Sequence, residues 1–180
     1  GVVLVVLQDN FKWSRTQISI GSLLSRVEGA ALGPVEGILI DKIGGRMMIL
    51  VGFSVMAIGF VLFSRINNLW NFYVTFIIIT LGSGIGGWLA VISILNNWFV
   101  KNRSKAMAAA MSGIYVSGFF LPLYAIAMTT SFRGTTFALG ILLLVVAVPC
   151  AKLIRNKPED LGLLPDGENA KVLQENKKDP

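Results

Sequence analysis

Histidine is absent from this sequence of 180 residues, and cysteine occurs once, as Cys150. Without histidine there is no imidazole for a catalytic triad, a histidine metal site or a histidine proton shuttle. A single thiol can form neither an internal disulfide nor a cysteine metal cluster, so we expect Cys150 to be a packing residue. The sequence therefore predicts no catalytic residue, no metal site, no cofactor and no enzyme.

Charge is also scarce. Charged residues make up 14% of the chain, whereas hydrophobic residues make up 54% and the mean hydropathy is +0.69. A water-soluble domain of this size rarely has that balance, so the composition predicts an all-α membrane protein. The net charge of +6 is spread over the ends of apolar segments, which argues against a nucleic-acid partner and for the lipid bilayer.

Polar residues divide the chain into apolar segments, most of them long enough for the ~20 residues that a bilayer crossing needs. Residues 1–8 are too few to cross, and we interpret them as the end of a truncated first helix. A signal peptide is the alternative, but this run has no basic leader and no small-residue cleavage pattern after it. The other expected segments are helices at 16–40, 47–64, 69–95, 104–130 and 134–154, a turn at 41–46 and a linker at 155–180.

Basic residues gather on one side of this arrangement. Eight lie on one side, namely Lys42, Arg46, Lys101, Arg103, Lys105, Lys152, Arg155 and Lys157. Four lie on the other, namely Lys12, Arg15, Arg65 and Arg133. Because cytoplasmic loops carry the excess of Lys and Arg, we expect the 41–46 turn, the turn before residue 104 and the C-terminal linker to be cytoplasmic. The expected location is the plasma (inner) membrane, crossed several times.

Three charges fall well inside the 16–40 segment: Arg26, Glu28 and Glu36. A charge near the bilayer midplane is costly unless it faces protein or a water-filled cavity. Two interpretations of Arg26 and Glu28 stay open: neutralisation by other helices, or lining of a solute cavity. Glu36 is nearer the helix end, which favours a structural partnership. Among the hydroxyl side chains of the 104–130 helix, Tyr115 is our cavity candidate.

Glycines recur at helical spacing in two places. Gly29, Gly33 and Gly37 are four residues apart, which lets a neighbouring helix pack closely. Gly82 and Gly86 lie in a glycine-rich stretch that lacks the lysine of a phosphate-binding loop and the histidine partner of a serine nucleophile. Close packing, or a bendable segment beside a cavity, is the better interpretation.

The polar stretch from residue 37 to residue 46 interrupts two apolar runs. It fits the pattern Gly-x-x-x-Asp-(Arg/Lys)-x-Gly-x-Arg through Gly37, Asp41, Lys42, Gly44 and Arg46. That pattern resembles the loop between the second and third transmembrane helices of the major facilitator superfamily of secondary transporters. An ordinary basic hairpin between two membrane helices is the alternative.

A narrower resemblance, to the monocarboxylate and oxalate/formate antiporter-like branch, covers about residues 13–167. It rests on Trp13-Ser14-Arg15, Arg26-Val-Glu28-Gly29, Gly33-Pro34, Asn97-Trp98-Phe99 with Arg103, and the run from Pro158 to Gly167. The glycine-proline pattern of drug antiporters is absent, since Gly118 is followed by Phe-Phe-Leu-Pro122. A sugar porter stays open as an alternative, although the sequence has no motif that supports it.

The resemblance implies the N-terminal six-helix half of a transporter, with the first helix truncated. It implies alternating access for a small organic anion of the mono- or dicarboxylate type, with or without a proton, and a partner in a missing C-terminal six-helix half. The 41–46 turn would be the cytoplasmic gate, Arg103 would belong to the cytoplasmic 4–5 loop, and Arg26 would be a candidate for anion attraction. A six-helix scaffold or partner subunit that does not transport is the alternative function.

Overall fold

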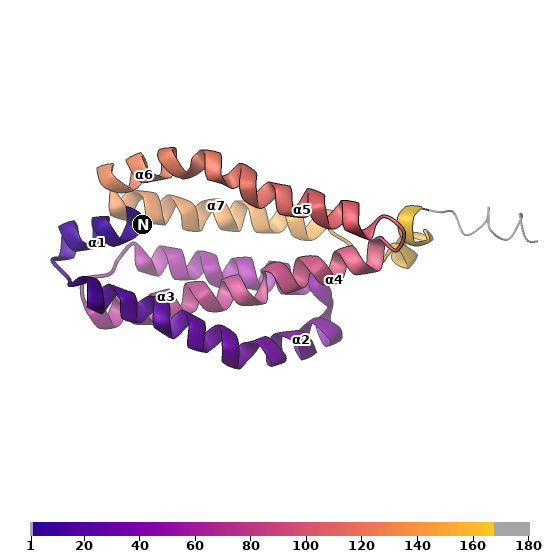
Figure 1. Ribbon diagram of the computed structural model, residues 1–180, viewed down its shortest axis with the longest axis horizontal. Helices are drawn as coiled ribbons and strands as arrows, with labels where there is room; N and C mark the ends of the chain where they lie inside the picture. The colour runs from indigo at the N-terminus through magenta and orange to yellow at the C-terminus, as the bar shows by residue number, and fades with distance from the viewer. Residues whose placement is uncertain (1, 168–180) are drawn as a thin grey trace, which may run out of the picture.

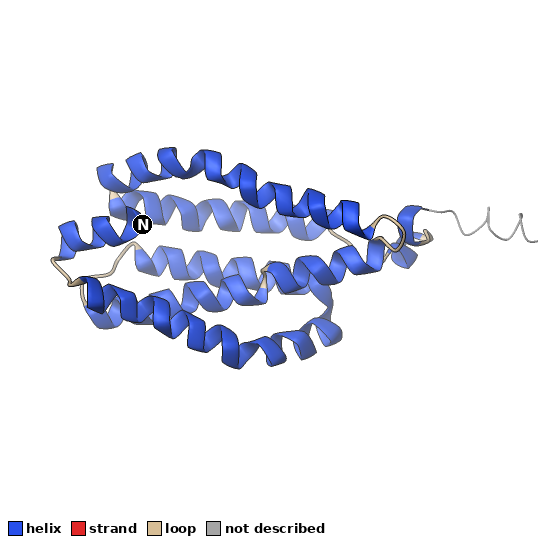
Figure 2. Cartoon of the chain, viewed as in Figure 1, coloured by secondary structure: helices blue, strands red, loops and turns tan. Residues whose placement is uncertain are grey.

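The computed structural model describes residues 2–167, and within that range every regular element is a helix (Figures 1 and 2). Residues 168–180, which form the distal part of the expected linker, lie outside the described residues. The helices are α1 (Val2–Phe11), α2 (Arg15–Phe63), α3 (Leu69–Ile85), α4 (Trp88–Trp98), α5 (Arg103–Ser117), α6 (Leu121–Thr130) and α7 (Phe132–Leu153). Short 3-10 turns follow at η1 (Gly118–Phe120), η2 (Pro158–Leu161) and η3 (Pro165–Gly167).

Helix α2 is far too long for one crossing, since its 49 residues would extend for ~73 Å at 1.5 Å per residue. It bends back on itself at Gly44, whose φ of 78° and ψ of 155° lie outside the helical region. Figure 1 shows the two halves of α2 running in opposite directions from this bend. The turn expected over 41–46 is thus concentrated in one residue, and the backbone on both sides stays helical.

The helix starts are fixed by side chains that bind exposed backbone N–H groups. Ser14 Oγ accepts from the backbone N of Gln17 at 3.2 Å, and Gln17 Oε1 accepts from the backbone N of Ser14 at 2.9 Å, which forms a capping box at the start of α2. Asn68 caps α3 in the same way, with Oδ1 2.8 Å from the backbone N of Asn71. These contacts set where each helix begins.

Glycines in the second half of α2 make the tightest packing in the bundle. Gly45, Gly52 and Gly59 are seven residues apart and therefore lie close to one helix face. A Cβ at Gly45 would lie 2.7 Å from Ile94 Cγ1, and a Cβ at Gly59 would lie 2.7 Å from Ile79 Cγ1. A Cβ at Gly52 would collide with the backbone of Gly86. This face of α2 therefore meets the backbone of α3 and its end directly at Gly52, and at Gly45 and Gly59 it receives the side chains of Ile94 and Ile79.

Helix α7 covers another side of the same segment. A Cβ at Gly140 would lie 2.9 Å from the backbone O of Ala57 and 2.8 Å from Val61 Cγ2, so α7 also approaches the second half of α2 closely. This half of α2 is the central element of the bundle. Helix α5, by contrast, has no buried residue.

Two apolar clusters lie at opposite ends of the bundle. One joins α1, α2, α3, α6 and α7 through Val6, Leu7, Ile18, Phe63, Ile66, Phe72, Met128 and Phe132. The other joins α2 and α4 through Ile40, Met48, Ile49 and Ala90, with Ile154 packed against it. Between and around them, large apolar side chains such as Val27 and Ile38 stay more than half exposed. Lipid is the medium that accommodates such a surface.

Four helical stretches are long and apolar enough to cross a membrane: Arg15–Phe63, Leu69–Trp98, Arg103–Thr130 and Phe132–Cys150. The second corresponds to α3 and α4, which are separated by a break at Gly86 and Gly87 where the sequence predicted one continuous helix. The third joins α5 to α6 through η1. The fold is therefore all-helical, as the composition predicted.

The Gly52→Ala variant tests the glycine packing. Its methyl group would collide with the Gly86 backbone, and overpacking of this kind costs about 1–3 kcal/mol. We expect the melting temperature of the detergent-solubilised protein to fall by several degrees. Gly29→Ala is the matched control because, apart from the local helix backbone, no atom of the described residues lies within 4 Å of its Cβ position. Equal melting temperatures for the two variants would contradict the packing described.

Candidate functional site

The first half of α2 presents two distinct faces. Ser22, Arg26, Gly29, Gly33 and Gly37 are spaced by three or four residues and share one face. No atom of the described residues lies within 4 Å of a Cβ built at any of the three glycines. Arg26 is exposed and has no hydrogen-bond or ion-pair partner within residues 2–167. We call this face, defined by these five residues, the open face of α2.

Two acidic residues in the first half of α2, Glu28 and Glu36, point elsewhere, toward α3. Glu28 Oε2 is hydrogen-bonded to Thr80 Oγ1, which also lies 3.1 Å from the backbone O of Phe76 and 3.0 Å from that of Ile77. Glu36, two turns further on, is only 9% exposed. Its carboxylate fills the space that a side chain at Gly84 would need. The two acids are therefore held between helices, whereas Arg26 is not.

A hollow of about 420 Å³ lies at one end of the open face, between α1, α2, α3 and α6. Ser22 from α2 and the half-buried Tyr124 from α6 are the hydroxyl-bearing residues among its lining. Apolar side chains make up the rest: Val3, Leu4, Leu7, Ile18, Phe72, Phe76 and Leu121. A solute in this hollow would find two hydroxyl groups, with Arg26 one helical turn beyond Ser22.

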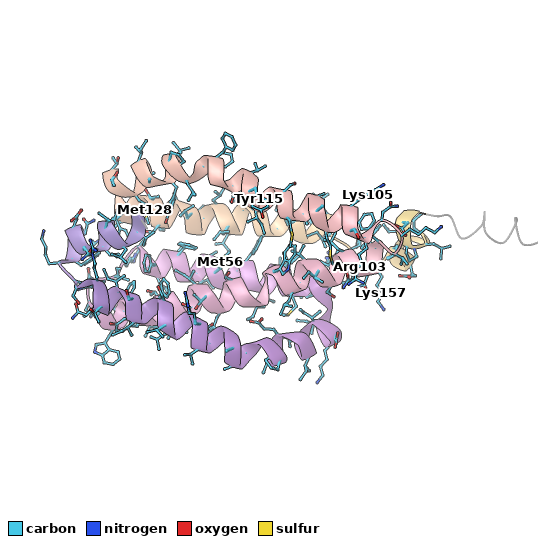
Figure 3. All side chains as sticks on the ribbon, in the orientation of Figure 1. Met56, Arg103, Lys105, Tyr115, Met128 and Lys157 are labelled. Atoms are coloured by element: carbon cyan, nitrogen blue, oxygen red, sulfur yellow. The ribbon has the colours of Figure 1, made fainter. Side chains whose placement is uncertain are left out.

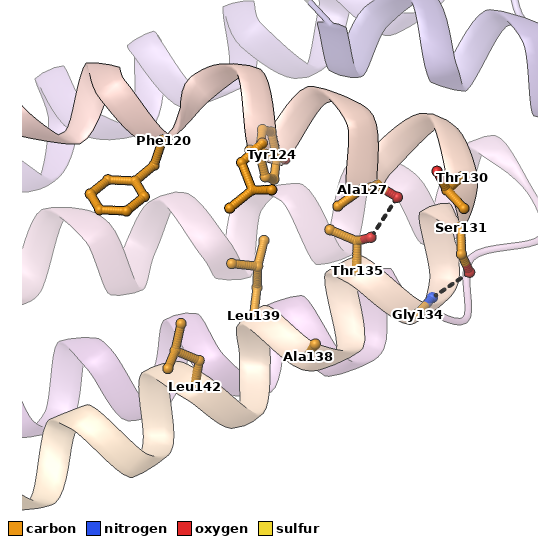
Figure 4. Close-up of a pocket in the computed structure, with 11 residues that line it drawn as sticks. Phe120, Tyr124, Ala127, Thr130, Ser131, Gly134, Thr135, Ala138, Leu139 and Leu142 are labelled. Atoms are coloured by element: carbon orange, nitrogen blue, oxygen red, sulfur yellow. Dashed lines mark hydrogen bonds between the residues drawn. The ribbon is translucent and has the colours of Figure 1, made fainter.

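A larger hollow of about 710 Å³ lies between α6 and α7 (Figure 4). No charged side chain lines it. The hydroxyl of Thr135 in its wall already donates to the backbone O of Ala127 at 2.8 Å, and Ser131 Oγ accepts from the backbone N of Gly134 at 3.3 Å (Figure 4). Its lining suits a lipid chain better than a charged solute.

The predicted gating residues lie at the bend of α2 and at its flanks. The side chains of Asp41 and Lys42 are exposed and make no hydrogen bond or ion pair within the part of the chain that the structure describes. Gly37 has no neighbour at its Cβ position among these residues. Gly44 and Arg46, in contrast, contact the segment that follows α7.

Asn156 is the residue that contacts the bend of α2 at Gly44 and Arg46. Its Oδ1 accepts a hydrogen bond from the backbone N of Arg46 at 2.8 Å. A Cβ at Gly44 would lie only 2.6 Å from Asn156 Nδ2, and the φ/ψ of Gly44 belong to a region that side chains exclude. Glycine is therefore required at this position both by the backbone conformation and by the neighbour.

The remaining predicted residues are distributed along the bundle. Arg103 is exposed at the start of α5, and Figure 3 shows it with Lys105 and Lys157 at the end where α4 meets α5. Tyr115 is 80% exposed on α5, about halfway along the bundle. Gly82 and Gly86 pack against Gly52, whereas Gly29 and Gly33 have no neighbour among the described residues. A cavity role for Tyr115 stays a prediction.

Sequence reasoning missed several residues of this site. Thr80, Asn156 and Asp166 act through partners more than fifty residues away in the chain, and no local pattern indicates such pairs. The packing glycines Gly45 and Gly52 could have been found, because their spacing of seven continues to Gly59.

Comparison with known proteins gives the family of the chain. Residues 1–179 match the Major Facilitator Superfamily. Mouse monocarboxylate transporter 14 is 28% identical over 177 residues, which cover 96% of this chain and 34% of that protein. Human monocarboxylate transporter 6 is 29% identical over 86% of this chain and 31% of its own length. Rat monocarboxylate transporter 13 is 31% identical over 68% of this chain and 29% of its own length.

The chain thus spans about a third of the length of the curated relatives it matches. The match to the superfamily, in contrast, extends over nearly the whole chain. Together with the membrane-spanning helices, it establishes that the chain belongs to the Major Facilitator Superfamily, a family of membrane transporters and not of enzymes.

Proposed function

We propose that this chain is the N-terminal six-helix half of a secondary transporter that moves a small organic anion, of the mono- or dicarboxylate type, by alternating access. Two observations support the substrate class: the relatives are named monocarboxylate transporters, and a cation lies on the open face of α2. The length of those relatives leaves room for a second six-helix half.

The exposed position of Arg26 carries the proposal. A guanidinium ten residues into an apolar helix lies ~15 Å along the axis, near the bilayer midplane, where an unpaired charge is costly. Within residues 2–167 Arg26 has no partner. A carboxylate solute passing between two halves of a transporter would supply one, since guanidinium binds carboxylate through paired hydrogen bonds.

The bend of α2 is the proposed cytoplasmic gate. Gly37, Asp41, Lys42, Gly44 and Arg46 would form it, with Asp41 free in this bundle to bind a helix end of the second half when the gate is closed. The basic residues at this end favour the cytoplasmic side of the plasma membrane. Arg103 would lie in the neighbouring 4–5 loop.

A scaffold without transport is the competing function. It offers no reason to keep Arg26 exposed on the open face, because a purely structural bundle would be more stable without that charge. Uptake measurements on the complete protein separate the two functions.

The Asp41→Asn variant tests the proposed gate. In proteoliposomes of the complete protein, Asp41→Asn should lower the uptake of a short-chain carboxylate by about tenfold, because a charged hydrogen bond of the closed gate is lost. Abundance should not change, since Asp41 has no partner within the described bundle. Asp9→Asn is the control, an exposed acid before the start of α2. Unchanged uptake would remove Asp41 from the gate.

The Arg26→Gln variant tests the proposed contact with the anion. Arg26→Gln should raise the KM for a carboxylate by roughly tenfold, because one charge-assisted hydrogen bond to the anion is lost. Arg26→Lys should retain part of the affinity, and Arg65→Gln, an exposed arginine in the link between α2 and α3, should have no effect. An Arg26→Gln transporter with normal KM and normal kcat would contradict an anion-binding role.

A further inference from the structure

The chain does not leave the bundle at the end of α7 but crosses the end at which α2 bends. We call residues 154–166 the strap. It starts at Ile154, which packs against the cluster of Ile40, Met48, Ile49 and Ala90. Pro158, at the start of η2, is also buried. The strap is therefore anchored by apolar contacts as well as by hydrogen bonds.

Its first polar contacts reach two helices. Asn156 Oδ1 accepts from the backbone N of Arg46, next to the bend of α2. The backbone O of Asn156 accepts from Asn97 Nδ2 at 3.1 Å, and the backbone O of Arg155 accepts from Trp98 Nε1 at 2.8 Å, both at the end of α4. Residues 155 and 156 thus connect the bend of α2 to the end of α4.

Its last contact reaches the turn that leads into α5. The carboxylate of Asp166 accepts hydrogen bonds from three successive backbone N atoms: Oδ2 from Val100 at 3.0 Å and Lys101 at 2.6 Å, and Oδ1 from Asn102 at 3.1 Å. Asp166 has a positive φ of 63°, a conformation in which aspartate is among the tolerated residues. The side chain of Asn102, the residue before α5, makes no capping hydrogen bond.

We propose that the strap is a positioning element of the transporter: Asn156 holds the Gly44–Arg46 bend, Asp166 holds the 100–102 turn, and the two turns move as one body with α7. That the two turns move together follows from the contacts of Asn156 and Asp166. An effect of the strap on the transport rate rests in addition on the proposed function. Closure of the gate at the Gly44–Arg46 bend would then also move the 100–102 turn into position.

Distance measurements test the mechanical claim without any assay of transport. Spin labels would be attached to Lys42→Cys and Lys105→Cys, both exposed positions, in a cysteine-free background of the complete protein that includes Cys150→Ala. The distance distribution should be narrow in this background and clearly broader after Asn156→Ala or Asp166→Ala. Glu159→Gln should leave it narrow, because the Glu159 carboxylate is exposed and has no hydrogen-bond or ion-pair partner in the described range. Unchanged distributions in both alanine variants would overturn the proposal.

Uptake measurements test the consequence for transport. Asn156→Ala should lower the kcat of carboxylate uptake by about tenfold with little change in KM, because it leaves the Arg46 N–H without its acceptor and does not touch the solute. Asn156→Asp keeps an acceptor oxygen and should restore most of the rate. A kcat unchanged by Asn156→Ala would refute the role in transport. If the unmodified protein takes up no carboxylate, the proposed function is wrong. The spin-label distances would still test whether the strap holds the two turns together.

The contact between the Asp166 carboxylate and the 100–102 turn should depend on pH. The backbone N–H of Lys101, with those of Asn102 and Val100, lowers the pKa of Asp166 below its usual range. The contact therefore stabilises the folded state above the unfolded pKa of ~3.9 and loses that effect as pH falls through the lower folded value. The ionisable residues of the two segments that meet here are Lys101, Arg103, Lys105, Arg155, Lys157, Glu159, Asp160 and Asp166.

Hydrogen exchange measures this dependence. At about pH 7 the amides of residues 100–102 should exchange more slowly in the unmodified protein than in Asp166→Asn, and the difference should disappear as the pH falls through the lowered pKa of Asp166, where both side chains become neutral. Comparison at equal pH removes the intrinsic pH dependence of exchange. Equal exchange at about pH 7 would show that Asp166 does not hold the turn.

Discussion

The close approach of backbones at Gly52, Gly82 and Gly86 is the contact on which the rest of the bundle depends. With no side chain between them, the second half of α2 and the α3–α4 pair lie close enough for backbone atoms to touch. In a membrane, where lipid competes equally for apolar side chains, contact of this kind is a main source of helix association. It also sets the separation at which Thr80 on α3 can reach Glu28 on the first half of α2.

Polar contacts then divide into two groups with different roles. Those along α2 lie among apolar helices, where Glu28 and Glu36 are held against α3 and Arg26 is left for a partner outside the described bundle. Those around Asn156 and Asp166 lie at one end, where backbone N–H groups of turns need acceptors. In the proposed transporter, the first group would bear on which solute crosses the membrane, and the second on how the ends of the helices move.

Sequence reasoning predicted the class of fold and the family. The all-helical membrane fold, the major facilitator resemblance and its monocarboxylate-transporter-like branch are confirmed by the helices and by the relatives. Each of these follows from properties that are local in the chain: hydropathy, residue spacing and a short motif. Ser14 as a cap is of the same kind, because its partner Gln17 is three residues away.

Long-range partners could not be predicted. Whether a glycine stripe packs depends on what lies opposite, so Gly29 and Gly33 look the same in sequence as Gly82 and Gly86, yet only the second pair has neighbours among the described residues. The break between α3 and α4 lies where Gly86 approaches Gly52, a residue more than thirty positions earlier in the chain. The strap depends on Asp166 finding a turn 64 to 66 residues earlier.

The links at the opposite end of the bundle are very short. Ser131 alone ends α6 and caps α7, and residues 12–14 and 64–68 are the other connections there. Links of this length scarcely rise above the bilayer surface. Among the described residues, that side therefore presents little polypeptide to a water-soluble protein, whereas the strap and the turns that it contacts lie at the other end.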